Sequence, residues 1–157
     1  MGDRQSIEVR VATAADAATL GRLLHAFNVE FDEETPDQDV IAGRAAPLIE
    51  SGELLVLLVG EGPDGFAQLR FRRSLYSDLL DASLDELYVV PGRRGTGLGR
   101  ALLDAALEHA RARGADHIEL NTSEADTAAL GLYESSGFTN REGGPAGPRM
   151  LYYERDL

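Results

Sequence analysis

The sequence predicts a mixed α/β (α+β) domain whose central sheet is mostly antiparallel and is flanked by about four helices. Three observations carry this prediction: the length of 157 residues, the 43% hydrophobic content, and short apolar strands interspersed with helical stretches. A chain of this length folds as one domain that buries roughly 70% of the surface its unfolded form exposes. We therefore expect a single domain over residues 1–157.

The elements follow from periodicity and from glycine and proline punctuation. Period-two alternation and short apolar runs indicate strands, and apolar residues three or four apart indicate helices. The predicted order is β-α-α-β-β-β-α-β-α-β-β, a mixture of hairpins and crossovers that produces a mixed sheet. The predicted strands are Ile7–Val11, Leu54–Val59, Phe66–Arg72, Leu84–Val90, Ile118–Leu120, Phe138–Asn140 and Met150–Glu154, and the predicted helices run from Thr13 or Asp16 to about Phe27, over about Gln38–Glu50, over about Gly97–Arg113 and over Ala125–Ser135.

Composition excludes several classes of function. There is no Cys, which excludes disulfides, thiolate metal sites and a Cys nucleophile, and the three His are scattered, so we expect no metal. The net charge of -12 argues against a nucleic acid partner. No apolar run is long enough to span a membrane, and the N-terminus has no apolar signal core, so we expect a cytoplasmic protein without a membrane partner.

Charge is distributed unevenly along the chain. Residues 28–39 and residues 76–91 contain acidic side chains and no basic one. Residues 92–101 contain Arg93, Arg94 and Arg100 and no acid. Acidic segments are often only solvated loops, but an acidic rim would also attract a cationic ligand, and the basic segment would attract an anion.

The basic segment is a glycine-rich turn between a strand and a helix. Glycine allows the backbone to approach a ligand, and the first turn of a helix offers unpaired N–H groups, so the turn predicts a phosphate site. A P-loop is excluded because the chain has no Lys, and the dinucleotide pattern GxGxxG fails because Arg100 occupies the third glycine position. The pattern that fits is Arg94-x-x-Gly97-x-Gly99.

This pattern resembles the pyrophosphate loop of the GNAT N-acetyltransferase superfamily, which binds acetyl-CoA. The segment from Ala128 to Phe138 (AALGLYESSGF) is similar to a second signature of that family, A-x-x-L-Y-x-x-x-G-F. The order of elements also resembles the family's across the whole chain. The resemblance implies one GNAT-like domain, acetyl-CoA as co-substrate, no metal, and transfer of an acetyl group by direct attack of an amine on the thioester.

The resemblance also implies which residues hold acetyl-CoA. The backbone of the fourth strand would pair with the pantetheine arm, and the N–H groups of the turn, with the arginines, would hold the pyrophosphate. Asp126 stands where the family often has Asn, so it would accept a bond from pantetheine or only cap the following helix. The implied residues are Leu87, Tyr88, Val89, Arg94, Gly95, Thr96, Gly97, Leu98, Gly99, Arg100, Asn121 and Asp126.

Three residues are candidates for the chemistry. Tyr133 matches the family tyrosine that protonates the leaving thiolate. The ammonium form of the acceptor must lose a proton, and Asp85, directly or through water, is our first candidate for the base, with Glu86 second. Strand alternation puts these two acids on opposite faces. Either acid could instead serve only to attract a cation.

The acceptor is less specified than the donor. The two acidic segments predict a cationic small-molecule amine, and Leu84-Asp-Glu-Leu-Tyr-Val has some similarity to the diamine-acetyltransferase branch. Three alternatives stay open: an acyl-CoA-binding sensor without turnover, a protein or peptide N-acetyltransferase, and a nucleotide-binding protein. The apolar segment Met150–Tyr153 fits either a core strand or a homodimer contact.

Overall fold

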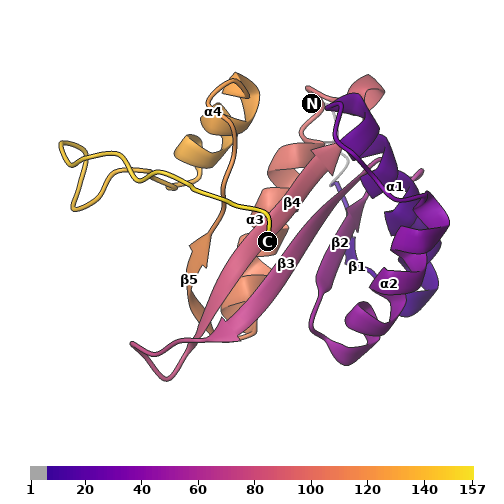
Figure 1. Ribbon diagram of the computed structural model, residues 1–157, viewed down its shortest axis with the longest axis horizontal. Helices are drawn as coiled ribbons and strands as arrows, with labels where there is room; N and C mark the ends of the chain where they lie inside the picture. The colour runs from indigo at the N-terminus through magenta and orange to yellow at the C-terminus, as the bar shows by residue number, and fades with distance from the viewer. Residues whose placement is uncertain (1–6) are drawn as a thin grey trace, which may run out of the picture. The chain divides into compact units, whose positions relative to one another are not determined.

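The computed structural model describes residues 7–157 (Figure 1). Its contacts divide the chain into two compact units, with the boundary between Leu120 and Asn121. The first unit contains the sheet, and the second contains one helix and the C-terminal segment. The strands are β1 (Val9–Val11), β2 (Leu55–Val59), β3 (Gly65–Arg73), β4 (Leu80–Val89) and β5 (Ala115–Glu119), and the helices are η1 (Ala14–Asp16), α1 (Ala17–Glu30), α2 (Gln38–Ser51), η2 (Pro91–Arg93), α3 (Leu98–Ala112) and α4 (Thr127–Ser135).

The sheet has five strands in the order β1-β2-β3-β4-β5. Neighbouring strands from β1 to β4 are antiparallel, and β4 and β5 are parallel because α3 carries the chain back across the sheet between them. The predicted fold class, a mixed and mostly antiparallel sheet with four α-helices, is confirmed.

Helices cover both faces of the sheet. Figure 1 shows α1 and α2 together on one side and α3 behind the strands. On the α1 side, Leu23 packs in a cluster with Phe66 and Tyr88, and on the α3 side Leu102 and Leu103 have no exposed surface. β2 is buried along its whole length, because both of its faces are covered.

Helix α1 is longer than the sequence predicts. It extends to Glu30, whereas apolar spacing predicts an end near Phe27. The additional turn brings the first carboxylate of the acidic segment into the folded part of the chain. Beyond it, the backbone of Asp32 adopts a positive φ of 56°, and the chain turns toward α2.

The second unit differs from the prediction. Helix α4 forms as expected, but the described residues after it form no strand, only an isolated bridge between Arg141 and Arg149. Two backbone bonds flank this bridge, from Glu142 N–H to the Pro148 carbonyl and from Met150 N–H to the Asn140 carbonyl. Proline has no N–H to extend the ladder, and residues 150–153 are exposed, so no buried apolar face supports the predicted strands.

Candidate functional site

A β-bulge in β4 determines where its two acids lie. Gln68 of β3 pairs with Glu86, and the next residue of β3, Leu69, pairs with Leu84, so Asp85 is the additional residue. Residues two apart in β3 share a face, and directly paired residues share that face across the strands. Glu86 therefore lies on the same face as Ser83, which pairs with Arg70. The expectation of opposite faces is wrong, because strict alternation does not continue through a bulge.

The carboxylate of Asp85 is bound by two neighbouring side chains on this face. Its carboxylate lies 3.2 Å from Arg70 Nε and accepts a hydrogen bond from the Ser83 hydroxyl at 2.8 Å. Asp85 is also exposed to solvent. Its charge is thus balanced by a cation from the adjacent strand.

Glu86 is in a different environment one residue later. It is partly buried, and within residues 7–157 its carboxylate has no hydrogen bond or ion pair. Burial, and secondly the negative charge of Asp85, raise the pKa of Glu86 from 4.5 to about 7. A carboxylate with a pKa near neutrality can gain and lose a proton at physiological pH.

The second half of β4 has one edge that no described strand covers. β5 pairs only with Leu80–Ser83, although β4 continues to Val89. The Val90 N–H donates to the Asp64 carbonyl on the β3 side, and backbone groups alternate between the two edges of a strand. The N–H and C=O groups of Leu87 and Val89 therefore face the edge that has no strand partner in the first unit. Such an edge can pair with an extended ligand.

The glycine turn offers backbone donors directly after this edge. Gly95 and Gly97 have φ values of 73° and 90°, which non-glycine residues adopt only with strain. The N–H groups of residues 95–99 have no backbone acceptor among the described residues, whereas that of Ala101 already donates to Gly97 in the first turn of α3. These N–H groups lie at the positive end of the helix dipole, where an anion is favoured. The Arg94 N–H, which we expected to join them, donates to the Pro91 carbonyl at 3.3 Å.

The side chain of Arg94 is held from two sides. Its Nε donates to the Val89 carbonyl at 2.9 Å, and its Nη2 donates to both carboxylate oxygens of Glu30, at 2.9 and 2.7 Å. Its guanidinium also lies 5.6 Å from the centroid of the Tyr88 ring. Arg94 thus connects the end of β4 with the end of α1.

Glu30 is a site residue that sequence reasoning missed. Its carboxylate also accepts the Tyr88 hydroxyl at 3.1 Å. Burial, followed by the bond to Glu30, raises the pKa of Tyr88, so the hydroxyl stays a donor. The sequence does contain a signal, an acid just after Phe27 with no base near it, but its partner is 64 residues away.

The two acidic segments differ once folded. In residues 76–91, Asp81 and Asp85 lie beside Arg72 and Arg70 of β3, at 3.7 and 3.2 Å. In residues 28–39 the acid with an ion pair in the described chain is Glu30. The remaining acids of that segment lie without an arginine beside them in the described part of the chain, and they are Asp32, Glu33, Glu34, Asp37 and Asp39.

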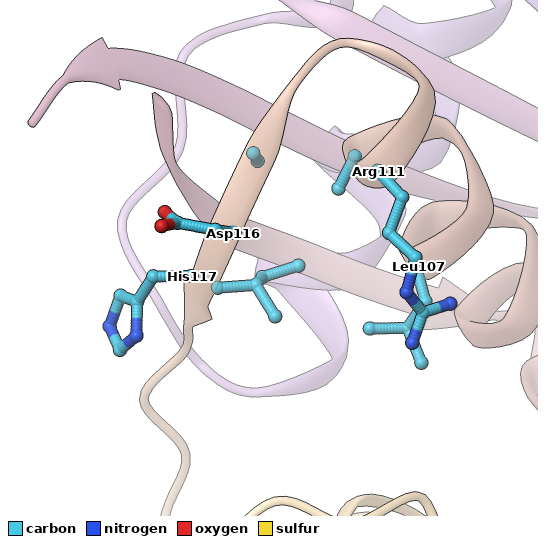
Figure 2. Close-up of a pocket in the computed structure, with 7 residues that line it drawn as sticks. Leu107, Arg111, Asp116 and His117 are labelled. Atoms are coloured by element: carbon cyan, nitrogen blue, oxygen red, sulfur yellow. The ribbon is translucent and has the colours of Figure 1, made fainter. Parts of the chain in front are cut away.

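A separate hollow of about 200 Å³ lies between α3 and β5 (Figure 2). Figure 2 shows Asp116 and His117 pointing away from the side of the strand where Leu107 and Arg111 lie. Its charged groups do not converge, so it is a weaker candidate than the β4 edge. Among residues 7–157, no three His, Cys, Asp or Glu side chains gather as metal ligands. The helices of the same residues include no candidate for a membrane span.

A sequence model of the Acetyltransferase (GNAT) family matches residues 20–138, which include the β4 edge, the glycine turn and α4. The chain belongs to this family. The resemblance inferred from the loop and from the segment ending in Phe138 is thereby confirmed.

Individual relatives agree with this assignment. A proposed acetyltransferase from Arthrobacter sp. FB24, known from a crystal structure, is 47% identical, with a TM-score of 0.89 over 99% of this chain and 100% of that one. An uncharacterized N-acetyltransferase of Bacillus subtilis is 30% identical over 87% of this chain and 93% of its own length. A mycothiol acetyltransferase of Thermobispora bispora is 56% identical over 62 residues, which are 38% of this chain and 21% of that protein. The chain thus spans about a fifth of that relative.

Three residues that the GNAT resemblance implies lie in the second unit. Asp126 caps α4, since its Oδ1 accepts the Ala129 N–H at 3.0 Å. The partly buried ring of Tyr133 packs edge-on against Phe138, with centroids 5.8 Å apart, and Asn121 is exposed. The other implied GNAT residues lie in the first unit, on β4, on the turn and at the start of α3.

Proposed function

We propose that this chain transfers the acetyl group of acetyl-CoA to the amine of a cationic small molecule. One observation carries the proposal: the edge of β4 at Leu87 and Val89, which no described strand covers, continues directly into a turn whose N–H groups at residues 95–99 have no backbone acceptor among the described residues. An extended chain that ends in a diphosphate matches this sequence of donors and acceptors. Membership of the GNAT family supports the same reaction class.

The donor supplies an acetyl group activated as a thioester. Leu87 would bind an amide group of the pantetheine arm through its edge-facing N–H and C=O groups. The N–H groups of residues 95–99 would hold the diphosphate, together with Arg94 and the exposed Arg100. The N–H of Val89 faces the same edge and would polarise the thioester carbonyl.

Glu86 is the base in this proposal. An amine reaches the enzyme mainly as ammonium and must lose a proton before it attacks. A carboxylate with a pKa of about 7 can accept that proton near neutral pH, and Glu86 has no cation beside it among residues 7–157, whereas Asp85 is paired with Arg70. The geometry thus favours Glu86, directly or through water, over our first candidate.

The second unit would complete the reaction. We propose that residues 1–157 act as one catalytic domain in which Tyr133 protonates the leaving thiolate and Asn121 and Asp126 line the pantetheine site. Tyr133→Phe tests this role: turnover should fall by about tenfold or more while CoA affinity is unchanged. A chain that binds CoA but never turns over would instead be an acyl-CoA sensor.

The acidic segment 28–39 supports a cationic acceptor. Apart from Glu30, its carboxylates have no arginine beside them in the described chain, so they attract a polyamine or another amine-bearing metabolite. Relatives named for mycothiol favour a small molecule over a protein. Location in the cytoplasm and pairing as a homodimer also stay predictions.

A panel of amines, assayed by release of the CoA thiol, tests the proposal. The panel contains spermidine, a neutral amino-acid amide, an acidic amino acid and a lysine peptide. We expect acetyl-CoA-dependent turnover that is fastest with spermidine. Preference for the acidic or neutral amines would contradict the cationic acceptor, and preference for the peptide would contradict the small molecule. Thermal stabilisation by ATP or NAD but not by CoA would contradict acetyl transfer altogether.

A further inference from the structure

Glu30 connects three parts of the site. It is the last residue of α1. Its carboxylate contacts the Tyr88 hydroxyl on β4 and the guanidinium of Arg94, the residue directly before Gly95 of the glycine turn. Its side chain is 26% exposed, against 45% for Arg94. Glu30 is thus partly shielded from solvent and interacts with Tyr88 and Arg94.

The position of Glu30 is unfavourable unless a cation is near it. The C-terminal end of a helix carries partial negative charge, and α1 has no basic residue in its last turn. Arg94 compensates for both negative charges with two short bonds to one carboxylate. The pair is therefore a direct contact between α1 and the turn.

The pair leaves one side of the guanidinium accessible. Nε is used by the Val89 carbonyl and Nη2 by Glu30, while Nη1 has no partner among residues 7–157. Two anchored nitrogens fix the plane of the group, and the third nitrogen keeps two N–H donors for an anion.

We propose that Glu30 is a positioning residue of the acetyl-CoA site, which orients Arg94 so that its Nη1 binds the cofactor's diphosphate. This inference rests on the proposed function, because it concerns the same diphosphate. Without Glu30, Arg94 would have to be ordered at the moment of binding, which costs side-chain entropy. Glu30 also repels the diphosphate, but across a guanidinium in a water-exposed site this costs only about twofold in affinity. A misaligned charge-assisted bond costs about tenfold, so positioning outweighs repulsion.

A double-mutant cycle on the full chain tests this inference. CoA affinity is measured by calorimetry for the native protein, Glu30→Gln, Arg94→Gln and the double variant. We expect Glu30→Gln to weaken CoA by about five- to tenfold in the native background and by less than about twofold beside Arg94→Gln. Equal effects in both backgrounds, or tighter binding in Glu30→Gln, would overturn the inference.

Two further variants separate positioning from charge and from folding. Arg94→Lys keeps the charge but cannot hold the two-sided geometry, so it should weaken CoA about as much as Glu30→Gln. Glu50→Gln removes an acid from the last turn of α2 and should leave CoA affinity unchanged. A native chain that does not bind CoA at all would refute the proposed function, whereas native affinity in Glu30→Gln would refute only the role of Glu30.

Discussion

The two halves of β4 have the same neighbour on one side and different neighbours on the other. From Leu80 to Ser83 the strand is paired on both edges, and Asp81 lies beside Arg72. From Glu86 to Val89 its only partner among the described strands is β3, and the Glu86 carboxylate has no hydrogen bond or ion pair there. The first half stabilises the sheet, and the second half leaves polar groups available for a ligand.

The boundary between the halves is the bulge at Asp85. A bulge adds one residue, bends the strand and increases its local twist. Here the β4–β5 ladder ends at Ser83, two residues before the bulge. Glu86 lies on the face of Tyr88, which α1 covers, and because of the bulge Ser83 lies on that face as well. The uncovered edge and the partly buried acid thus both begin directly after the bulge.

Replacing the acid of the second half should have the largest effect. We expect Glu86→Gln to lower kcat by about 10²- to 10⁴-fold, because the variant cannot accept a proton from the ammonium. The KM for acetyl-CoA should change little, since Glu86 does not contact the phosphates in the proposed site. Steady-state kinetics with the best amine of the panel measures both constants.

The pH profile sharpens the same prediction. Below its pKa of about 7, Glu86 is protonated and cannot act as a base, so native kcat/KM should fall as the pH drops through about 7. Glu86→Gln should lack this dependence. A variant that keeps both native activity and the native pH profile would show that the second half of β4 does not supply the base.

Local patterns made the turn predictable from sequence. Glycines, a strand before them and a helix after them are sequence-adjacent features, and the positive φ of Gly95 and Gly97 follows from residue type. Asp126 as a helix cap was predictable for the same reason, since a cap acts within three residues.

Features set by distant partners were not predictable. The bulge is defined by the register of β4 against Gln68 and Leu69, which alternation within β4 does not contain. Residues 76–91 contain no basic residue, so the sequence predicts that they attract a cation. In the folded chain, however, Asp81 and Asp85 are paired with arginines of β3. The contact of Glu30 with Arg94 depends on how α1 lies on the sheet.

The second-largest predicted effect is on stability: Glu86 should lower the free energy of unfolding at high pH. The pKa of Glu86 rises from 4.5 to about 7 in the folded chain, so its protonated form favours folding. This contribution is fully present below pH 4.5 and is lost as the pH rises through about 7. As the pH rises from the lower to the upper limit, the free energy of unfolding of Glu86→Gln minus that of the native chain should therefore increase by about 2 kcal/mol.

Urea unfolding of both proteins at pH 4.5 and pH 8 measures this difference. The other carboxylates titrate in both proteins and largely cancel in the comparison. A constant difference between the two proteins across this range would mean that Glu86 is as well solvated in the folded chain as in the unfolded one.

A smaller effect is expected from Gly95→Ala in the glycine turn that follows the second half of β4. Gly95 has a φ of 73° and open space around its missing Cβ, so Gly95→Ala meets no clash and tests conformation alone. We expect a stability loss of about 1 kcal/mol and CoA binding about fivefold weaker, because the N–H groups reorient. Gly92→Ala is the matched control, since Gly92 has equal space and no positive φ, and it should match the native chain. Equal effects at the two glycines would argue against a preorganised turn.

Asp85→Asn should have the smallest effect, and it tests the comparison most directly. The residue lies at the boundary, and its ion pair with Arg70 is between side chains that are 29% and 46% exposed. Such a pair contributes about 0–1 kcal/mol, and removing it leaves Arg70 in contact with water rather than buried. We therefore expect kcat within about threefold of native, with the pH dependence near 7 retained, because the negative charge of Asp85 is only the second cause of the raised pKa of Glu86. If Asp85→Asn instead lost as much activity as Glu86→Gln, the base would be Asp85, the first candidate from the sequence. The bulge would then not be the boundary between a structural half of β4 and a catalytic one.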